Sequence, residues 1–269
     1  MKIYIIAVLL GIILSACSQS ESLGPGYEFS LFKNTPNAAL AKAAEDEDTN
    51  DINRILKGKG VNINYQEPQY GNTVLSLAVS NGKVKSVKAL LDHGANFNIL
   101  DSNHFAAIHE ATNMIDLRRN VSQILSLLLQ YGANANMPSD TANGYDILKF
   151  YLPLMGAVTN LECTRLLLSY KANFYYKIDE DYPVWTNLLI YDAPFDENIF
   201  VAKYLLIDKQ MKMPDTIFYT MPDHKPVRAL DLLKKFKVYD DPEKIKAKQE
   251  ILDYLNKIGF PEHGAYTEK

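Results

Sequence analysis

Residues that could support catalysis or bind a metal ion are few and poorly spaced in this 269-residue chain. Of its five histidines, His104 and His109 lie nearest together, and a spacing of five does not place two ligands on one helix face. The sequence contains no His-Glu-x-x-His, Gly-x-Ser-x-Gly or Walker motif and no cysteine and histidine pair at zinc-site spacing. We therefore expect no catalytic residues, no metal site and no cofactor.

Two acidic clusters and one cysteine are likewise not expected to take part in catalysis. Residues 45–48 are all acidic and are expected to form a solvated turn, and residues 179–181 have no nucleophile beside them. Cys163 lies in a leucine-rich run that predicts a helix, so we expect it to be buried rather than reactive.

Net charge and composition restrict the class of partner. The chain has 28 Lys and Arg against 32 Asp and Glu, and 47% of its residues are hydrophobic. This composition excludes a disordered chain, and the acidic balance argues against binding to nucleic acid or to an anionic lipid surface. An electrostatically attracted partner should therefore be basic.

A repeat of about 33 residues organises the chain. The clearest unit starts at Gly71-Asn72-Thr73-Val74-Leu75 and closes at Gly94-Ala95-Asn96, and Leu75 corresponds to Ile108 in the next unit. Thr73 is suited to cap a first short helix, and Val87, Leu90 and Leu91 lie on one face of a second. Each helix is too short to persist alone, so stacked units must share one core.

These units resemble the ankyrin repeat, in which G-x-T-P-L-H-x-A leads to V-x-x-L-L-x-x-G-A-x-x-N. The resemblance implies an all-α fold, an ankyrin-repeat solenoid of about five to six helix-turn-helix units with loop or β-hairpin fingers. It covers roughly residues 35–262, with a fourth unit opening at 144–148, a fifth at 185–189 and a capping unit from 227–233 to 254–260. Gly94, Gly132 and Lys171 then fall where a left-handed residue ends the second helix, and His109 is expected to bond the backbone of an adjacent repeat.

Aromatic residues are frequent in the segments where ankyrin proteins present their fingers. Tyr and Trp are enriched at interface hot spots, and here several rings surround the acidic residues 179–181. Packing of these rings within the fold is the alternative, above all for Phe97 and Trp185. The predicted partner-binding residues are Tyr65, Tyr70, Phe97, Asp101, Tyr145, Tyr175, Tyr176, Asp179, Glu180, Asp181, Tyr182 and Trp185.

The first residues resemble a bacterial lipoprotein signal. Lys2 precedes an apolar run, and Leu14-Ser15-Ala16-Cys17 resembles the lipobox, whose cysteine is acylated after cleavage. We expect a signal peptide at 1–16, an acylated Cys17 with a flexible tether at 17–34, and the repeat domain at 35–269. A plain secretory signal is the alternative. Ser18 instead of Asp favours the outer membrane, with the protein facing the periplasm.

Fold and location together favour a lipid-anchored protein that binds one protein partner. By resemblance, its most specific form is an immunity lipoprotein that neutralises a type VI secretion toxin such as a phospholipase. The alternative is a periplasmic adaptor or chaperone-like partner of an envelope enzyme, and a hydrolase is a distant third. Neither nucleic acid nor a small-molecule substrate is expected, and the membrane is reached through the lipid alone.

Overall fold

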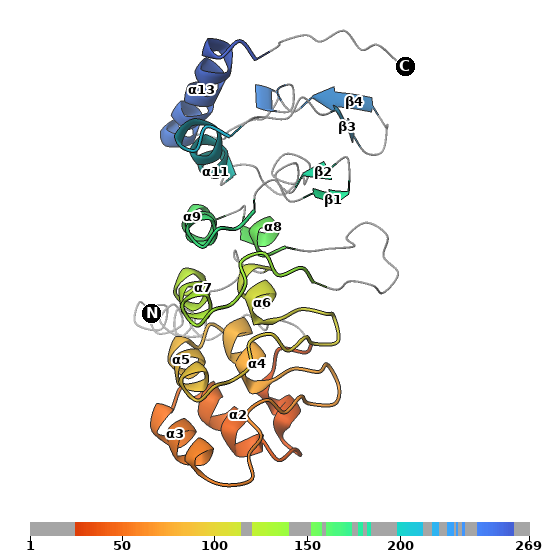
Figure 1. Ribbon diagram of the computed structural model, residues 1–269, viewed down its shortest axis with the longest axis vertical. Helices are drawn as coiled ribbons and strands as arrows, with labels where there is room; N and C mark the ends of the chain where they lie inside the picture. The colour runs from red at the N-terminus through yellow and green to blue at the C-terminus, as the bar shows by residue number, and fades with distance from the viewer. Residues whose placement is uncertain are drawn as a thin grey trace, which may run out of the picture.

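Short helices stack in pairs to form an elongated solenoid (Figure 1). The computed structural model describes residues 25–113, 120–139, 152–157, 160–173, 177–179, 182–183, 198–211, 217–220, 225–228, 230, 233–234 and 241–260. An inner row contains α2 (Ala38–Glu45), α4 (Val74–Ser80), α6 (Ala107–Asn113) and α8 (Pro153–Ala157). An outer row contains α3 (Thr49–Lys57), α5 (Val84–Asp92), α7 (Val121–Gln130), α9 (Leu161–Ser169), α11 (Asn198–Lys203) and α13 (Pro242–Lys257).

The second repeat shows why these sequences form paired helices. The Thr73 hydroxyl accepts the Ser76 backbone N–H at 3.0 Å, and the Ser76 hydroxyl accepts the Thr73 N–H at 2.9 Å. This reciprocal capping box satisfies two N–H groups that the first turn of α4 leaves without helical partners. The predicted cap at Thr73 is confirmed.

Left-handed residues end three outer helices as predicted. The φ angles are +80° at Gly94 after α5, +96° at Gly132 after α7 and +64° at Lys171 after α9. Glycine adopts this conformation without steric cost, whereas lysine is strained in it.

One continuous core runs between the two rows of helices. Leu75, Val87, Leu90 and Leu91 are all buried, and the core continues through Cys163 and Leu167 to Leu255. The predicted all-α ankyrin solenoid is confirmed, with strands found within the described residues only in finger hairpins.

Fingers project from the inner side of the solenoid, and two of them contain antiparallel hairpins (Figure 1). One pairs β1 (Lys177–Asp179) with β2 (Tyr182–Pro183), in the finger predicted around residues 179–181, which is the fourth finger. The other pairs β3 (Ile217–Thr220) with β4 (Lys225–Arg228), with Phe218 opposite Val227. Val227 and Arg228, where the capping unit was expected to open, belong to this hairpin.

The folded body begins before residue 35. Phe29 and Phe32 lie in a single turn of 3-10 helix, η1 (Phe29–Phe32), and both are buried against the first repeat. The predicted flexible tether of residues 17–34 is therefore too long at its C-terminal end. The signal peptide and Cys17 lie outside the described residues.

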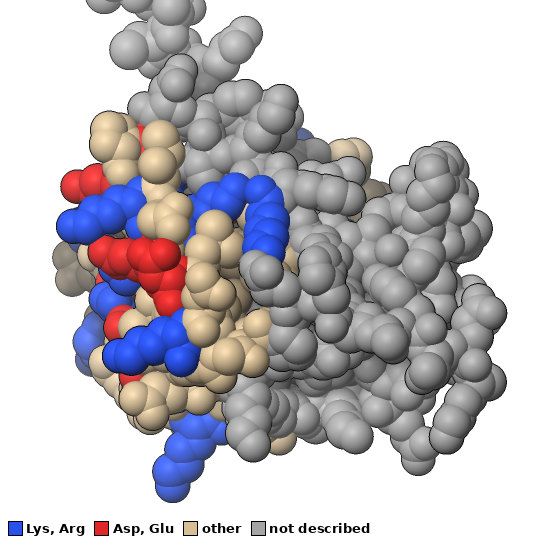
Figure 2. Space-filling view, turned by 90° about the horizontal axis from the view of Figure 1, so that it is seen from above, with Lys and Arg blue, Asp and Glu red and all other residues tan. Residues whose placement is uncertain are grey.

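The C-terminal end is a polar capping helix. Helix α11 continues as one turn of π-helix, η4 (Tyr204–Asp208), and both contact α13. The Asp241 carboxylate caps α13 by accepting the N–H groups of Glu243 and Lys244, with Pro242 in the first turn. Figure 2, which looks down on this end, shows basic and acidic side chains interspersed on its described surface. Such a polar outer face is expected of a terminal repeat.

Across the described residues, no helix is long and apolar enough to cross a membrane.

Candidate functional site

The first finger is the segment between α3 and α4, and its tip folds around one carboxylate. Glu67 is 1% exposed, and its two oxygens accept the backbone N–H groups of Gln69, Tyr70 and Asn72 at 2.7, 2.9 and 3.0 Å. Three N–H donors satisfy a carboxylate that would otherwise be costly to bury. The loop is thus closed by its own side chain. Sequence reasoning missed Glu67, although its position in a Pro- and Gly-containing loop was a usable signal.

In the second finger, the segment between α5 and α6, the carboxylate of Asp101 likewise binds backbone N–H groups of its own loop. This carboxylate accepts the backbone N–H groups of Asn103 at 2.9 Å and Phe105 at 2.8 Å. Burial raises the pKa of Asp101 above its ordinary value, and the hydrogen bonds from Phe105 and Asn103 oppose that shift. Asp101 was predicted to bind a partner, and in the structure its carboxylate closes its own loop.

The two finger tips are joined to each other. The Ser102 backbone N–H donates to the Tyr70 carbonyl oxygen at 2.8 Å. The Gln66 side-chain amide donates to the carbonyl oxygens of Gly71 and Leu100, at 2.8 and 2.9 Å. These contacts make the first two fingers one connected platform.

The N-terminal segment engages the predicted tyrosines of the first finger. Phe32 and Tyr65 meet edge to face, with ring centroids 6.4 Å apart. Gly26 approaches the Tyr70 ring so closely that a Cβ on it would lie 3.5 Å from the ring atoms. Both tyrosines are half-buried, and their role in partner binding remains a prediction.

The same segment is tied to both ends of α4. The Asn72 side-chain amide donates to the Gly26 carbonyl oxygen at 3.0 Å, and the Asn81 amide donates to the Tyr27 carbonyl oxygen at 2.8 Å. Residues 26–27 therefore lie along an inner helix and cover part of the inner face.

The remaining predicted partner-binding residues are placed less completely. Phe97 is half-buried and packs against the core. Backbone positions are described for Asp179 and Tyr182, which belong to the β1–β2 hairpin. The residues outside the described part of the chain are Tyr145, Tyr175, Tyr176, Glu180, Asp181 and Trp185.

His109 has the structural role expected of it. Its Nδ1 accepts the Ala106 backbone N–H at 3.0 Å, and its Nε2 lies 2.7 Å from the Met137 carbonyl oxygen in the next repeat. These partners require a neutral ring protonated on Nε2. Burial lowers the pKa of His109 below 6.5, and the bond to Met137 offsets part of the shift.

Cys163 is also buried as predicted, and burial raises its pKa to about 12. Its thiol is therefore a poor nucleophile at neutral pH. Among the described residues, no group of three or more His, Cys, Asp or Glu side chains could hold a metal ion.

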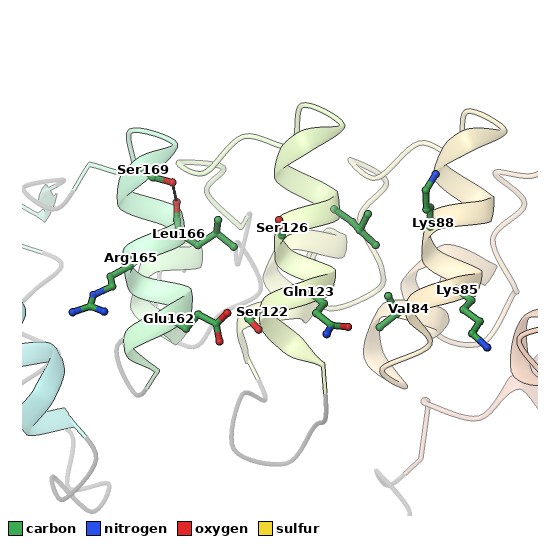
Figure 3. A pocket seen from close by; sticks show the side chains of 11 residues that line it. Val84, Lys85, Lys88, Ser122, Gln123, Ser126, Glu162, Arg165, Leu166 and Ser169 are labelled. Atoms are coloured by element: carbon green, nitrogen blue, oxygen red, sulfur yellow. Dashed lines mark hydrogen bonds between the residues drawn. The ribbon is translucent and has the colours of Figure 1, made fainter.

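A hollow of about 720 Å³ crosses the outer face of the solenoid (Figure 3), and its helices lie on the side opposite the fingers (Figure 1). It is open to solvent and is lined from three consecutive outer helices. Its lining residues are Val84, Lys85 and Lys88 on α5, Ser122, Gln123, Ser126 and Leu127 on α7, and Glu162, Arg165, Leu166 and Ser169 on α9. None of these residues was predicted as a site, because the hollow is lined by side chains from three different repeats.

Comparisons with known proteins agree with this architecture. Residues 40–139 match the sequence profile of the family described as ankyrin repeats (3 copies). The crystal structure of EF0377, an ankyrin repeat protein, superposes with a TM-score of 0.57 at 20% identity, and the match covers 83% of this chain and 98% of that one.

Two relatives match less than half of the chain. Ankyrin repeat protein FPV031 of fowlpox virus is 31% identical over 116 residues, which are 43% of this chain and 32% of the viral protein. The E3 ubiquitin-protein ligase KEG of Arabidopsis thaliana is 29% identical over 103 residues, 38% of this chain and 6% of the ligase. The chain therefore spans less than a third of the length of these relatives. Residues 40–139 carry ankyrin repeats, and the chain has the ankyrin-repeat fold, a scaffold for protein–protein interaction.

Proposed function

We propose that this protein is a lipid-anchored, periplasm-facing ankyrin protein of the outer membrane that binds and neutralises one protein partner. In its most specific form it is an immunity protein against a type VI secretion toxin such as a phospholipase. A basic patch on the toxin would meet the acidic chain.

The joined first and second fingers are the observation that carries the binding function. Glu67 and Asp101 each close a loop, and the Ser102–Tyr70 bond connects the two loops. A surface whose loops are already ordered loses less conformational entropy when a partner binds. This rigidity suits stoichiometric capture of a folded protein.

The entry point of the chain supports anchoring with the finger side toward the membrane. Gly26 lies beside Tyr70 of the first finger and Asn72 at the start of α4. A lipid on Cys17 would therefore tether the protein from its inner face. A partner captured there would be held near the membrane, where a phospholipase acts.

We place the centre of this interface at the fourth finger, because Tyr175, Tyr176, Tyr182 and Trp185 surround the carboxylates of residues 179–181 in sequence. Rings supply rigid contact area, and the carboxylates should accelerate encounter with a basic partner.

Coexpression with the secreted toxin encoded nearest its own gene tests the proposal. The wild type should rescue growth and co-purify with the toxin as one complex. Cys17→Ser should lose palmitate labelling. The triple change of Asp179, Glu180 and Asp181 to Asn, Gln and Asn should slow association more than it speeds dissociation.

Asp253→Asn on the exposed face of α13, which removes a single carboxylate, is the control and should leave the kinetics unchanged. Rescue without a detectable complex, or the absence of a neighbouring secreted toxin, would contradict the immunity function. Equal labelling of wild type and Cys17→Ser would contradict the lipid anchor.

A further inference from the structure

The first described residues of the chain lie on the inner face of the second repeat in the way that a bound peptide would. The carbonyl oxygens of Gly26 and Tyr27 accept hydrogen bonds from the side-chain amides of Asn72 and Asn81, at 3.0 and 2.8 Å. Asn72 lies before α4 and Asn81 ends it, so the two bonds hold consecutive residues against one helix. Figure 1 shows this part of the chain in red, beside α2 and α4. Residues 25–28 are called the strap below.

The contacts of the strap use its main chain and its glycine. Main-chain carbonyls are present in any extended peptide, whereas the place beneath the Tyr70 ring is selective. Gly26 is buried there with a φ of +98°, and a Cβ on it would lie 3.5 Å from the ring. A larger side chain would press on the ring, and the positive φ disfavours every residue but glycine. The surface therefore fits a glycine whose own carbonyl and the next one face α4.

The two amides are held in place by α4 as well as by the strap. The Asn81 amide also donates to the Leu77 carbonyl oxygen at 2.8 Å, and the Asn72 side-chain oxygen accepts the Ser76 hydroxyl at 3.3 Å. These bonds remain when the strap leaves. Donors that are already oriented lose little conformational entropy on binding, so the surface can receive another peptide.

The strap is the part of the N-terminal segment that can open by itself. Phe29 and Phe32 in η1 are buried against the first repeat and anchor the chain that follows. Pro25 and Glu28, at the two ends of the strap, are exposed. Short segments at the edge of a folded body open locally at a lower free energy than the whole fold. Opening of the strap uncovers the Tyr70 ring and leaves η1 in place.

We propose that this surface is a binding site for an extended peptide segment, which the protein fills with its own strap until a partner displaces it. The partner segment places a glycine against the Tyr70 ring, and its main-chain carbonyls replace those of Gly26 and Tyr27. Tyr70 belongs to the first finger, so the strap competes with the partner for part of the finger surface. The competition holds for any partner segment of this kind and does not depend on the proposed toxin.

Gly26→Val in the full chain releases the strap and leaves Tyr70, Asn72 and Asn81 unchanged. The probe is a fluorescein-labelled peptide with the sequence of residues 23–28, and fluorescence anisotropy measures its binding. The peptide should bind Gly26→Val at least about tenfold more tightly than the wild type, because the tethered strap acts at a high effective concentration. Adding Asn81→Ala to Gly26→Val should abolish binding, and the same peptide carrying Gly26→Val should not bind.

Gly60→Val is the matched control, because Gly60 has a φ of +102° and no atom within 4 Å of an added Cβ. It introduces the same backbone strain away from the strap, so it should bind the peptide as weakly as the wild type does. Failure of the peptide to bind folded Gly26→Val, or equal binding to Gly26→Val and Gly60→Val, would overturn the proposal.

Proteolysis of the wild type tests the opening itself, even if Gly26→Val fails to fold. Chymotrypsin cleaves after tyrosine, and an open strap exposes the bond after Tyr27. Cleavage at this bond should depend little on urea and should precede cleavage within the repeats. The same urea dependence at both places would mean that the strap opens only when the whole protein unfolds, and the proposal would then be wrong.

Discussion

The backbone N–H of Ser102 lies 2.8 Å from the carbonyl oxygen of Tyr70, and this bond joins the tips of the first two fingers. Main-chain atoms form the bond, so its geometry depends on how each loop is folded rather than on which side chains it carries. Glu67 folds one loop and Asp101 folds the other. Two carboxylates placed 34 residues apart therefore determine whether the fingers act as one surface.

Replacing Gly71 with alanine should loosen this junction. Gly71 has a φ of +71°, and an added Cβ would lie 3.2 Å from the Ser102 backbone nitrogen. The left-handed conformation alone costs an alanine about 1–2 kcal/mol, and crowding against Ser102 adds to it. Gly94→Ala is the control, because Gly94 has a φ of +80° and no atom within 4 Å of the added Cβ. Urea denaturation should show the larger loss for Gly71→Ala, and equal losses would mean that the contact with Ser102 is easily relieved.

Replacing Lys171 with glycine should stabilise the fold. The lysine backbone is strained at a φ of +64°, its side chain is exposed, and its carbonyl oxygen, which glycine keeps, accepts the Asn136 amide. Relief of the strain exceeds the extra entropy of glycine in the unfolded chain by a few tenths to about 1 kcal/mol. The reverse change at the equivalent position, Gly132→Lys, should be destabilising. A lower urea midpoint for Lys171→Gly would contradict this account.

Replacing Leu91 with alanine should lower the stability of the stacked repeats. Leu91 is 4% exposed within the shared core, and replacing a buried leucine with alanine costs about 2–5 kcal/mol. Ile258→Ala is the control, since Ile258 is 54% exposed and its truncation should change stability by less than about 0.5 kcal/mol. Thermal melts followed by circular dichroism measure both, and similar melting temperatures would argue against a continuous core at Leu91.

Stability should fall as the pH drops below 6.5 because of His109. Burial lowers the pKa of the folded state below that value, so the unfolded chain binds a proton that the folded chain excludes. The contribution is complete above pH 6.5 and is lost progressively below it, by at most about 1.4 kcal/mol per pH unit.

His109→Gln separates this effect from the titration of carboxylates. Glutamine can still donate to the Met137 carbonyl but has no group that titrates in this range. The variant should be less stable than the wild type at pH 7.5, and the gap should narrow toward pH 5.5. A gap that stays constant across this interval would show that His109 does not titrate differently on folding.

The sequence by itself determined the repeat and its local chemistry. Thr73, Gly94, Lys171 and His109 each do what was expected of them, because caps, left-handed ends and repeat-to-repeat bonds depend on neighbours at fixed sequence distance. The buried Cys163 follows from the same helical periodicity. The β3–β4 hairpin was not predicted, because it precedes the capping helix in a segment that does not follow the repeat pattern.

Only the tertiary structure decided which surfaces remain available to a partner. Tyr65 and Tyr70 fit the composition of an exposed interface, and they contact Phe32 and Gly26 because the N-terminal segment folds back over α4. The outer hollow is lined from three repeats, so Lys88, Ser126 and Arg165 share it although they lie 38 and 39 positions apart in the sequence. Local patterns specify helices through neighbouring residues, whereas a surface is assembled from side chains that only the stacking of repeats brings together.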